Sequence, residues 1–394
     1  MTDTALSPAP SRPSVRPLRA GAGAVATTIA SVLPVFLVGG LAVQMGDDLG
    51  FSPAGLGLAV SVYFGVSAVA SVPSGRLVER VGPAVVARVG ILLAAGCLLA
   101  IAVLARSYPV LVGLLALSAT GNALGQLASN ATLARHVPPR RQGLSFGVKQ
   151  AAIPVSTLLA GAAVPAIALT AGWRWAFVAA AGAALAALPA VPPGEAGPAR
   201  ERAVGRGGRA TTALVVVGLA ATLAAGAANA LGTFVVDSSA ARGLAPGPAG
   251  LVLTLGSAVC VAARVGAGWL ADRRESGHVA LIAGMLLVGA VGLGLLAVAG
   301  AAPLTAGVVL GFGLGWAWPG LMNFAVVRLH PQAPAAATSI TQTGVYAGGC
   351  LGPLGLGALA GAAGYPAMWL TAAVAMLAAA ALMLTGSRML VRRP

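Results

Sequence analysis

Twelve apolar runs, separated by turn or charge signals, constrain the fold of this chain more than any other feature. Their approximate bounds are 21–45, 53–74, 83–105, 109–134, 143–170, 173–192, 211–236, 248–270, 278–299, 303–328, 335–361 and 365–387. Most have about the 20 residues that a helix needs to cross a bilayer. They lack the alternating pattern of membrane β-strands, and lipid-facing spans must otherwise be helices. The chain is therefore predicted to be an all-α membrane protein with twelve transmembrane helices.

Composition excludes the other broad classes of protein. The chain of 394 residues is 58% hydrophobic and only 8% charged, whereas a soluble domain is about 25% charged. The net charge of +15 would indicate nucleic-acid binding in a soluble protein, but these arginines lie in short loops and are typical of a topology signal. The three cysteines and three histidines show no metal or pairing pattern, and no catalytic or phosphate-loop motif is present. We therefore expect no enzyme activity, catalytic residue, metal, cofactor or nucleic-acid partner.

The distribution of arginines predicts the orientation of the chain. If the N-terminus is inside, nineteen arginines fall in inner segments and three in outer loops, Arg106, Arg174 and Arg242. An excess of positive charge on the cytoplasmic side is the usual determinant of topology. We expect a multi-pass protein of the cell membrane (plasma or inner membrane), with both termini in the cytoplasm.

The longest polar stretch after the N-terminal tail divides the twelve spans into two groups of six. It reads "PPGEAGPARERAVGRGGRA", Pro192 to Ala210, and its composition is typical of a flexible linker. The predicted organisation is a disordered cytoplasmic tail over 1–20, a six-helix half over 21–192, a cytoplasmic linker over 193–210, a second six-helix half over 211–387, and a short tail over 388–394.

The two halves are related by one constant shift of 193 residues. "GRLVERVG" begins at Gly75 and "GWLADRRE" begins at Gly268, and each follows the second span of its half. The same shift relates Glu79 to Asp272, Arg80 to Arg273, Asn130 to Asn323 and Arg135 to Arg328. Repeated halves of this kind are typical of transporters whose binding site lies between the repeats.

With these features the chain resembles the major facilitator superfamily over essentially its whole length. The twelve spans, the two halves and the loop signature Gly-x-x-x-Asp-Arg carry the resemblance. Gly268, Asp272 and Arg273 match the signature, and the first half has Gly75 and Arg80 with Glu79 in place of aspartate. "GWRWAF" at Gly172 is also similar to a family sequence. The resemblance implies two pseudo-symmetric six-helix halves that work by alternating access.

The resemblance also implies a latch that closes the cytoplasmic side. A carboxylate at a helix end can bind the positive N-terminus of a neighbouring helix. The candidate gating residues are Gly75, Glu79, Arg80, Arg135, Gly268, Asp272 and Arg273. Glu79 and Asp272 are the expected latch acids, Arg80, Arg273 and Arg135 their expected partners, and the glycines the points of close helix contact. The alternative is that the arginines are only topology signals.

Two cations lie inside predicted spans that contain no acid. Lys149, the only lysine of the chain, follows the expected start of its span by six residues, and Arg264 precedes Asp272 by eight. At about 1.5 Å per residue both lie roughly 9–12 Å deep. Burying such charges costs about 3 kcal/mol each or more, which a bound anion would offset. The alternatives are that Lys149 extends to the lipid headgroups and that Arg264 binds carbonyl groups or a latch acid.

Polar and aromatic residues on other spans complete the predicted binding site. In addition to Lys149 and Arg264 they are Gln150, Asn122, Gln126, Asn229, Trp316, Gln342, Thr343 and Tyr346. The 193-residue shift relates Lys149 to Gln342 and Gln150 to Thr343. The alternative for each of them is a hydrogen bond that joins two helices.

The predicted function is secondary active transport of a small solute, an organic or inorganic anion, by alternating access. The expected partners are this solute, a co-transported proton or ion, and the lipid bilayer, and a monomer would suffice. The alternative is proton-coupled efflux of amphipathic drugs. Whether the transporter is a symporter or an antiporter is left open. "GGCLGPLGLG" at Gly348 is similar to a motif of drug antiporters, but lies in span eleven instead of span five. The family's coupling arginine in span four is also absent from "LALSATGNALG".

Overall fold

The computed structural model describes residues 17–51, 53–193, 208–244 and 246–391, and all its regular elements are helices. The α-helices are α1 (Pro17–Gly40), α2 (Ala42–Leu49), α3 (Pro53–Val81), α4 (Pro83–Leu104), α5 (Tyr108–His136), α6 (Gln142–Ala163), α7 (Leu169–Ala171), α8 (Trp173–Ala186), α9 (Gly208–Ala241), α10 (Pro246–Asp272), α11 (His278–Leu295), α12 (Ala301–Leu310), α13 (Pro319–Leu329) and α14 (Pro334–Val391). Short turns are 3₁₀ at η1 (Pro139–Arg141) and η3 (Leu188–Ala190), and π-helical at η2 (Val164–Ala168) and η4 (Gly311–Gly315).

Twelve crossings follow from these elements. Ten of the described helical segments are long and apolar enough to span a membrane. The last of them, α14, has 58 residues and is broken at Gly364, where φ is +82°. Glycine adopts this conformation without steric cost, so the chain reverses there and forms two crossings. A further crossing is α6, which continues through η2 into α7. The predicted all-α membrane fold is confirmed.

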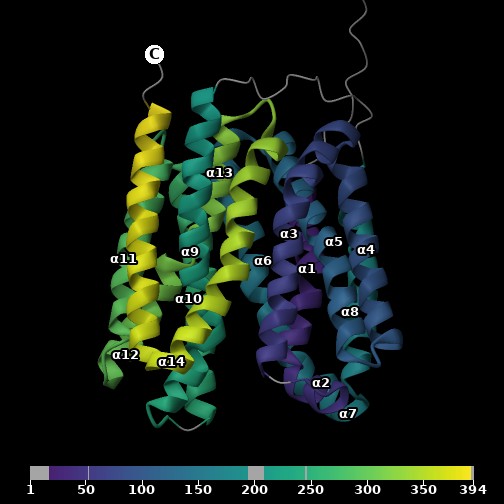
Figure 1. The fold of residues 1–394 in the computed structure, drawn as a ribbon. Coiled ribbons are helices and arrows are strands. Elements are labelled where there is room, and N and C mark those ends of the chain that lie inside the picture. The colour runs from purple at the N-terminus through teal and green to yellow at the C-terminus, as the bar shows by residue number, and fades with distance from the viewer. Residues whose placement is uncertain (1–16, 52, 194–207, 245, 392–394) are drawn as a thin grey trace, which may run out of the picture.

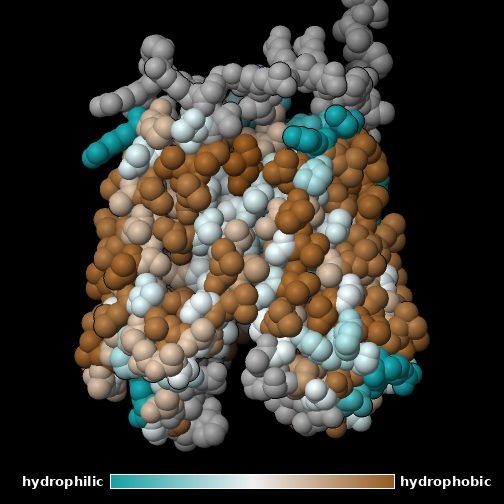
Figure 2. All heavy atoms as spheres, in the orientation of Figure 1, coloured by the Kyte–Doolittle hydropathy of each residue, from teal (hydrophilic) through white to brown (hydrophobic). Residues whose placement is uncertain are grey.

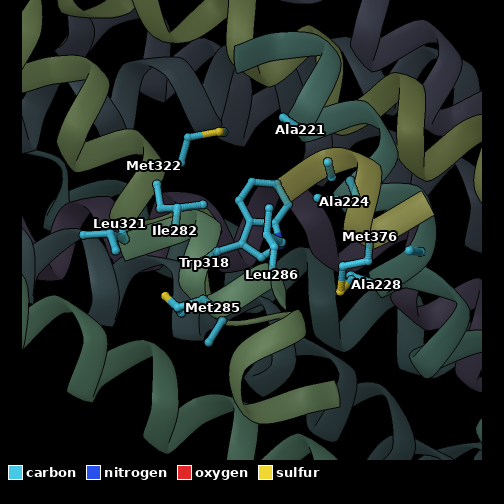
Figure 3. Packing of buried hydrophobic residues seen from close by; sticks show 14 of the residues in the cluster. Ala221, Ala224, Ala228, Ile282, Met285, Leu286, Trp318, Leu321, Met322 and Met376 are labelled. Atoms are coloured by element: carbon cyan, nitrogen blue, oxygen red, sulfur yellow. The ribbon is translucent and has the colours of Figure 1, made fainter. Parts of the chain in front are cut away.

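Two bundles stand side by side, α1–α8 and α9–α14 (Figure 1). Each has its own apolar core, and the core of the second surrounds Trp318, which is fully buried among side chains of α9, α11, α13 and α14 (Figure 3). The outer surface of the molecule is mostly hydrophobic (Figure 2). Large apolar side chains such as Val69, Val103 and Val291 are exposed on it, as expected for contact with lipid.

Both described ends of the chain lie at one end of the molecule (Figure 1). We call this end of the molecule the terminal end and define it by Pro17, Asp272 and Val391. The other end, near α2 and Gly364, is called the opposite end. Helix α1 begins at Pro17, inside the predicted tail, and α9 begins at Gly208, inside the predicted linker. Helix α14 continues past residue 387 to Val391. The other residues of the predicted tails and linker, 1–16, 194–207 and 392–394, lie outside the described residues.

Candidate functional site

Each half supplies one acid to the start of a helix in the other half. Glu79, near the end of α3, accepts a hydrogen bond of 2.9 Å from the backbone N–H of Ala335 at the start of α14. Asp272, the last residue of α10, accepts bonds of 2.6 Å and 2.9 Å from the N–H groups of Gly143 and Leu144 at the start of α6. The first N–H groups of a helix have no partner within the helix and carry its positive dipole end. The geometry is therefore that of two latches at the terminal end.

Glycines allow the helices at these latches to touch. A methyl group on Gly75 would lie 2.8 Å from Cβ of Ser339 and 2.9 Å from the Ala335 oxygen. A methyl group on Gly268 would collide with the Gly143 carbonyl oxygen. Any larger residue at Gly75 or Gly268 would therefore hold the two halves apart.

The arginines of the loop signature do not make the contacts that the sequence predicts. Arg135 forms an ion pair of 3.4 Å with Glu79. Arg80 is exposed, and within the described residues no ion pair joins it to Glu79. Arg273 stacks on Trp269, with its guanidinium carbon 3.7 Å from the ring centroid, instead of binding Asp272. The structure does not show the predicted pairing of Arg80 and Arg273 with the latch acids. Glu79 accepts from Ala335 and Arg135, and Asp272 accepts from Gly143 and Leu144.

Lys149 is fully buried, seven residues into α6 and so roughly 10 Å from the terminal end of that helix. Its side chain is 0% exposed. The ammonium donates to the side-chain oxygens of Gln126 and Asn130 on α5, the second at 3.1 Å. A side chain extended to the lipid headgroups would be exposed at its tip, so this alternative does not describe the structure. The predicted residue Gln126 holds the lysine in place.

Arg264 crosses from the second half to the first. It is 2% exposed and lies on α10. Its Nη1 donates to the Gln150 carbonyl oxygen at 2.6 Å, and its Nη2 and Nε donate to the Trp316 carbonyl oxygen at 3.0 Å and 3.3 Å. The alternative of carbonyl partners is therefore the observed one, and Asp272 is not a partner.

Helix interruptions free the two carbonyl groups that Arg264 binds. In a regular helix the Gln150 oxygen would accept from residue 154, but Pro154 has no N–H. Trp316 lies where the chain leaves the π-turn η4, ahead of Pro319 at the start of α13. Backbone groups freed inside a membrane must find other partners. The guanidinium supplies them with a planar set of donors.

Both cations are buried, and neither has a counter-ion among the described residues. The partners of Lys149 are amides and those of Arg264 are backbone carbonyls, all of them neutral. Arg264 also repels Lys149 electrostatically. The chain has nine acidic residues. Those with described side chains lie at helix ends or in loops, and among them Asp272 is eight residues from Arg264, roughly 12 Å along α10. Two basic side chains are thus buried with only neutral partners among the described residues.

Next to the cations lies a cluster of buried polar atoms without hydrogen-bond partners. They are Oδ1 of Asn122, Oε1 of Gln150 and the hydroxyl of Tyr346. The Tyr346 hydroxyl faces Asn122 and Gln342. Asn122 lies on α5, Gln150 on α6, and Gln342 and Tyr346 on α14, so the cluster spans both halves. Buried polar groups normally have partners, which makes unpaired ones here a candidate binding site.

Three other predicted site residues lie at the margins of the cluster. Thr343 donates across the halves to the Ala68 oxygen at 3.3 Å and also to the Ser339 oxygen. Asn229 donates to the Ala225 oxygen of its own helix, α9. The Trp316 ring packs against Phe312 and lies 5.8 Å from the Arg264 guanidinium. Asn229 and Trp316 are half-buried, and no described contact places Asn229 next to Lys149.

The sequence did not single out Phe64, Ser67 or Asn130 for this site. Phe64 on α3 stacks on Tyr346 with ring centroids 6.1 Å apart, and Ser67 accepts a hydrogen bond of 3.2 Å from Asn122. Asn130 binds Lys149. Of the three, only Asn130 had a usable signal, since the 193-residue shift relates it to Asn323. An aromatic or a serine in an apolar span gives no indication of which way it faces.

The halves touch from the terminal end to about the middle of the molecule. The hydrogen bonds between described residues of the two halves join Glu79 to Ala335, Asp272 to Gly143 and Leu144, Arg264 to Gln150, Thr343 to Ala68, and Ser61 to Cys350. Cys350 lies about halfway along the first arm of α14. The two halves are therefore joined at the terminal end in this structure.

Comparisons with known proteins identify the class of protein that this fold defines. The profile of the Major Facilitator Superfamily matches residues 24–353, so the chain belongs to this superfamily of membrane transporters. The family and the fold are those of secondary transporters and not of enzymes. No curated protein sequence matches the chain.

Solved structures of other transporters share the fold. The human organic anion transporter MFSD10 (TETRAN) has a TM-score of 0.75 at 16% identity, covering 94% of this chain and 100% of that one. The proton:xylose symporter XylE, bound to 6-bromo-6-deoxy-D-glucose, has a TM-score of 0.77 at 14% identity, with coverages of 94% and 95%. FucP in the outward conformation has a TM-score of 0.69 at 15% identity, with coverages of 93% and 98%. At these identities the likeness establishes the fold alone.

Proposed function

We propose that this protein is a secondary active transporter of a small organic or inorganic anion. The observation that carries the proposal is the pair of buried cations, Lys149 and Arg264, which have only neutral partners. A charge inside a membrane protein is costly unless something compensates it. An anion between the two cations would compensate both, and the planar guanidinium suits a carboxylate or phosphate group.

The position of the cations suits alternating access. Lys149 belongs to the first half and Arg264 to the second, so an anion that binds both would interact with both halves. The unpaired atoms of Asn122, Gln150 and Tyr346 would supply hydrogen bonds to the rest of the solute. Opening the two latches would expose this region to the terminal end, and separating the halves at the opposite end would expose it there.

The proposal includes an orientation and an assembly. The terminal end would face the cytoplasm, so that both termini are cytoplasmic in the cell membrane, because the arginine excess lies there. A monomer would suffice, since the site is formed within one chain. A proton or another ion would move with or against the anion. Two reporters fused in turn to the C-terminus test the orientation, one active only in the cytoplasm and one active only outside the membrane. Activity of the first is expected, and activity of the second alone would overturn the orientation.

Thermal unfolding of the purified protein in detergent tests the substrate class. The ligands are a panel of small carboxylates, phosphate and sulfate, and a panel of amphipathic drugs. The variants are Lys149→Gln and, as a control for charge, Arg388→Gln at an exposed position. The 193-residue shift relates Lys149 to Gln342, so glutamine is already used at the equivalent place. A ligand that binds only the folded state raises the melting temperature by mass action.

An anion that stabilises wild type and Arg388→Gln, but not Lys149→Gln, is the expected result. Uptake of that anion into proteoliposomes is then measured, and Lys149→Gln should lose this uptake. Stabilisation by drugs alone, equal in all three proteins, would overturn the anion proposal and favour drug efflux instead. Equal stabilisation of all three proteins by an anion would exclude Lys149 from the site.

A further inference from the structure

A second basic site lies outside the central one, in a pocket at the terminal end. The pocket has a volume of about 680 Å³, within the range of roughly 300–1,000 Å³ that is typical of small-molecule sites. Five arginines line it, namely Arg140, Arg141, Arg273, Arg274 and Arg328. The only carboxylates in the lining are Asp272 and Glu275, which leaves a net charge of +3.

The lining carboxylates form no ion pair with these arginines among the described residues. Asp272 already accepts hydrogen bonds from Gly143 and Leu144. The ion pairs among the described residues are Arg135–Glu79 and Arg174–Asp48, and neither involves an arginine of the pocket. Arg273 and Arg328 lie over the rings of Trp269 and Phe324, which leaves their guanidinium edges able to donate hydrogen bonds. The pocket therefore offers five cationic side chains to an anion, two of which pack over aromatic rings.

The equivalent latch of the other half shows that the fold does not need this many arginines. The 193-residue shift relates Arg140 and Arg141 to Ala333 and Pro334, and Arg274 to Val81. The Glu79 latch nevertheless has the same form, an acid at the start of a helix. Arg140, Arg141 and Arg274 are thus not required for this contact between the halves. They occur at the Asp272 latch and have no counterpart at the Glu79 latch. Arginines that only determine topology do not need to line a common pocket.

The pocket borders the lipid-facing surface. Trp269 lines it and is 47% exposed, and its neighbour Leu270 is 39% exposed. Tryptophan is enriched where a membrane protein meets the headgroup region. Basic pockets between helices at this level suit the phosphate groups of lipids, and guanidinium groups match phosphate by paired hydrogen bonds.

We infer that this pocket binds a phosphate-bearing anion, either the headgroup of an anionic lipid or a soluble phosphate compound. The site is separate from the central cations and does not depend on the proposed transport function. Its walls include Leu144 of α6 and Asp272 of α10, the two sides of one latch. An occupant therefore contacts both halves and stabilises the state in which the terminal end is closed.

Thermal unfolding of delipidated full-length protein tests this inference. The additives are phosphatidylglycerol, phosphatidylcholine as the zwitterionic control, and glycerol phosphate as the soluble source of phosphate. The pocket variant is Arg140→Gln with Arg141→Gln. The matched control is Arg76→Gln with Arg388→Gln, which removes two exposed arginines from the same end but outside the pocket.

Phosphatidylglycerol should raise the melting temperature of wild type and of the matched control more than phosphatidylcholine does. The pocket variant should need at least about tenfold more of it for the same rise, because each lost charge-assisted bond weakens binding by about that factor. The same pattern with glycerol phosphate would assign the site to a soluble compound. An equal response in both double variants, or none in wild type, would overturn the site. Lys149→Gln should respond like wild type, which separates this result from the central anion site.

Discussion

The latch at Asp272 makes a quantitative prediction about the balance between conformations. Its carboxylate accepts two backbone hydrogen bonds from the other half, at 2.6 Å and 2.9 Å. Hydrogen bonds to a charged group contribute about 1.5–3 kcal/mol each when well shielded. Asp272 is half-exposed, so solvent screening reduces this, and we take about 2 kcal/mol for the pair. These bonds exist only while the terminal end is closed.

Asp272→Ala should therefore shift the equilibrium toward the state that is open at the terminal end by about thirtyfold, because 1.36 kcal/mol corresponds to a factor of ten. Distances between spin labels at positions 80 and 388, one in each half at the terminal end, measure this shift. Both positions are exposed. The native cysteines Cys97, Cys260 and Cys350 are first replaced by alanine, so that only the introduced labels report.

Glu275→Ala is the matched control, since it also removes one acid from this end. Glu275 is exposed and lies just beyond the latch. The long-distance population should grow in Asp272→Ala and stay unchanged in Glu275→Ala. If both variants keep the wild-type distance distribution, the Asp272 bonds do not hold the terminal end closed. If both change equally, the effect is one of net charge and not of the latch.

Three further predictions follow from individual contacts. Gly147→Ala should destabilise the protein by about 1–3 kcal/mol in thermal unfolding, because its methyl group would collide with the Arg264 carbonyl oxygen. Gly182→Ala, with nothing within 4 Å, should stabilise slightly as a control, and equal effects would contradict the role of the close contact. Tyr346→Phe removes a buried hydroxyl that faces Asn122 and Gln342, so it should weaken transport, and unchanged transport would remove Tyr346 from the site. Hydrogen bonds from Arg174 and Trp173 hold the pKa of Asp48 below its usual 3.8. Its stabilisation is therefore complete above that pH and is lost as the pH falls through the lowered value. The melting-temperature deficit of Asp48→Asn at pH 6 should therefore shrink as the pH falls below 3.8, and a constant deficit would contradict the ion pair.

Much of the fold follows from the sequence because membrane helices are specified locally. Apolar runs of about 20 residues and the breaks between them depend only on neighbouring residues. The predicted limits 361 and 365 enclose Gly364, at which α14 reverses. The 193-residue shift related Glu79 to Asp272, and the structure gives both acids the same kind of partner, the start of a helix in the other half.

The partners of the functional side chains were decided by the tertiary structure. The sequence predicted that Lys149 and Arg264 lie at similar depth. It did not predict the direction in which each side chain points. Their partners come from other helices, namely Gln126 and Asn130 for Lys149, and the carbonyl groups of Gln150 and Trp316 for Arg264. Arg80 and Arg273 were expected to bind acids that instead accept hydrogen bonds from Ala335 and Arg135 (Glu79) and from Gly143 and Leu144 (Asp272).

The sequence by itself determined the class of protein, the repeat and the residues that could matter. Hydropathy and charge determine the fate of each membrane segment separately, so their effects can be predicted from the order of residues along the chain. The rotation of each helix about its axis and the contacts between the halves depend on packing of the whole chain. For this reason only the folded molecule shows two buried cations whose partners are all neutral.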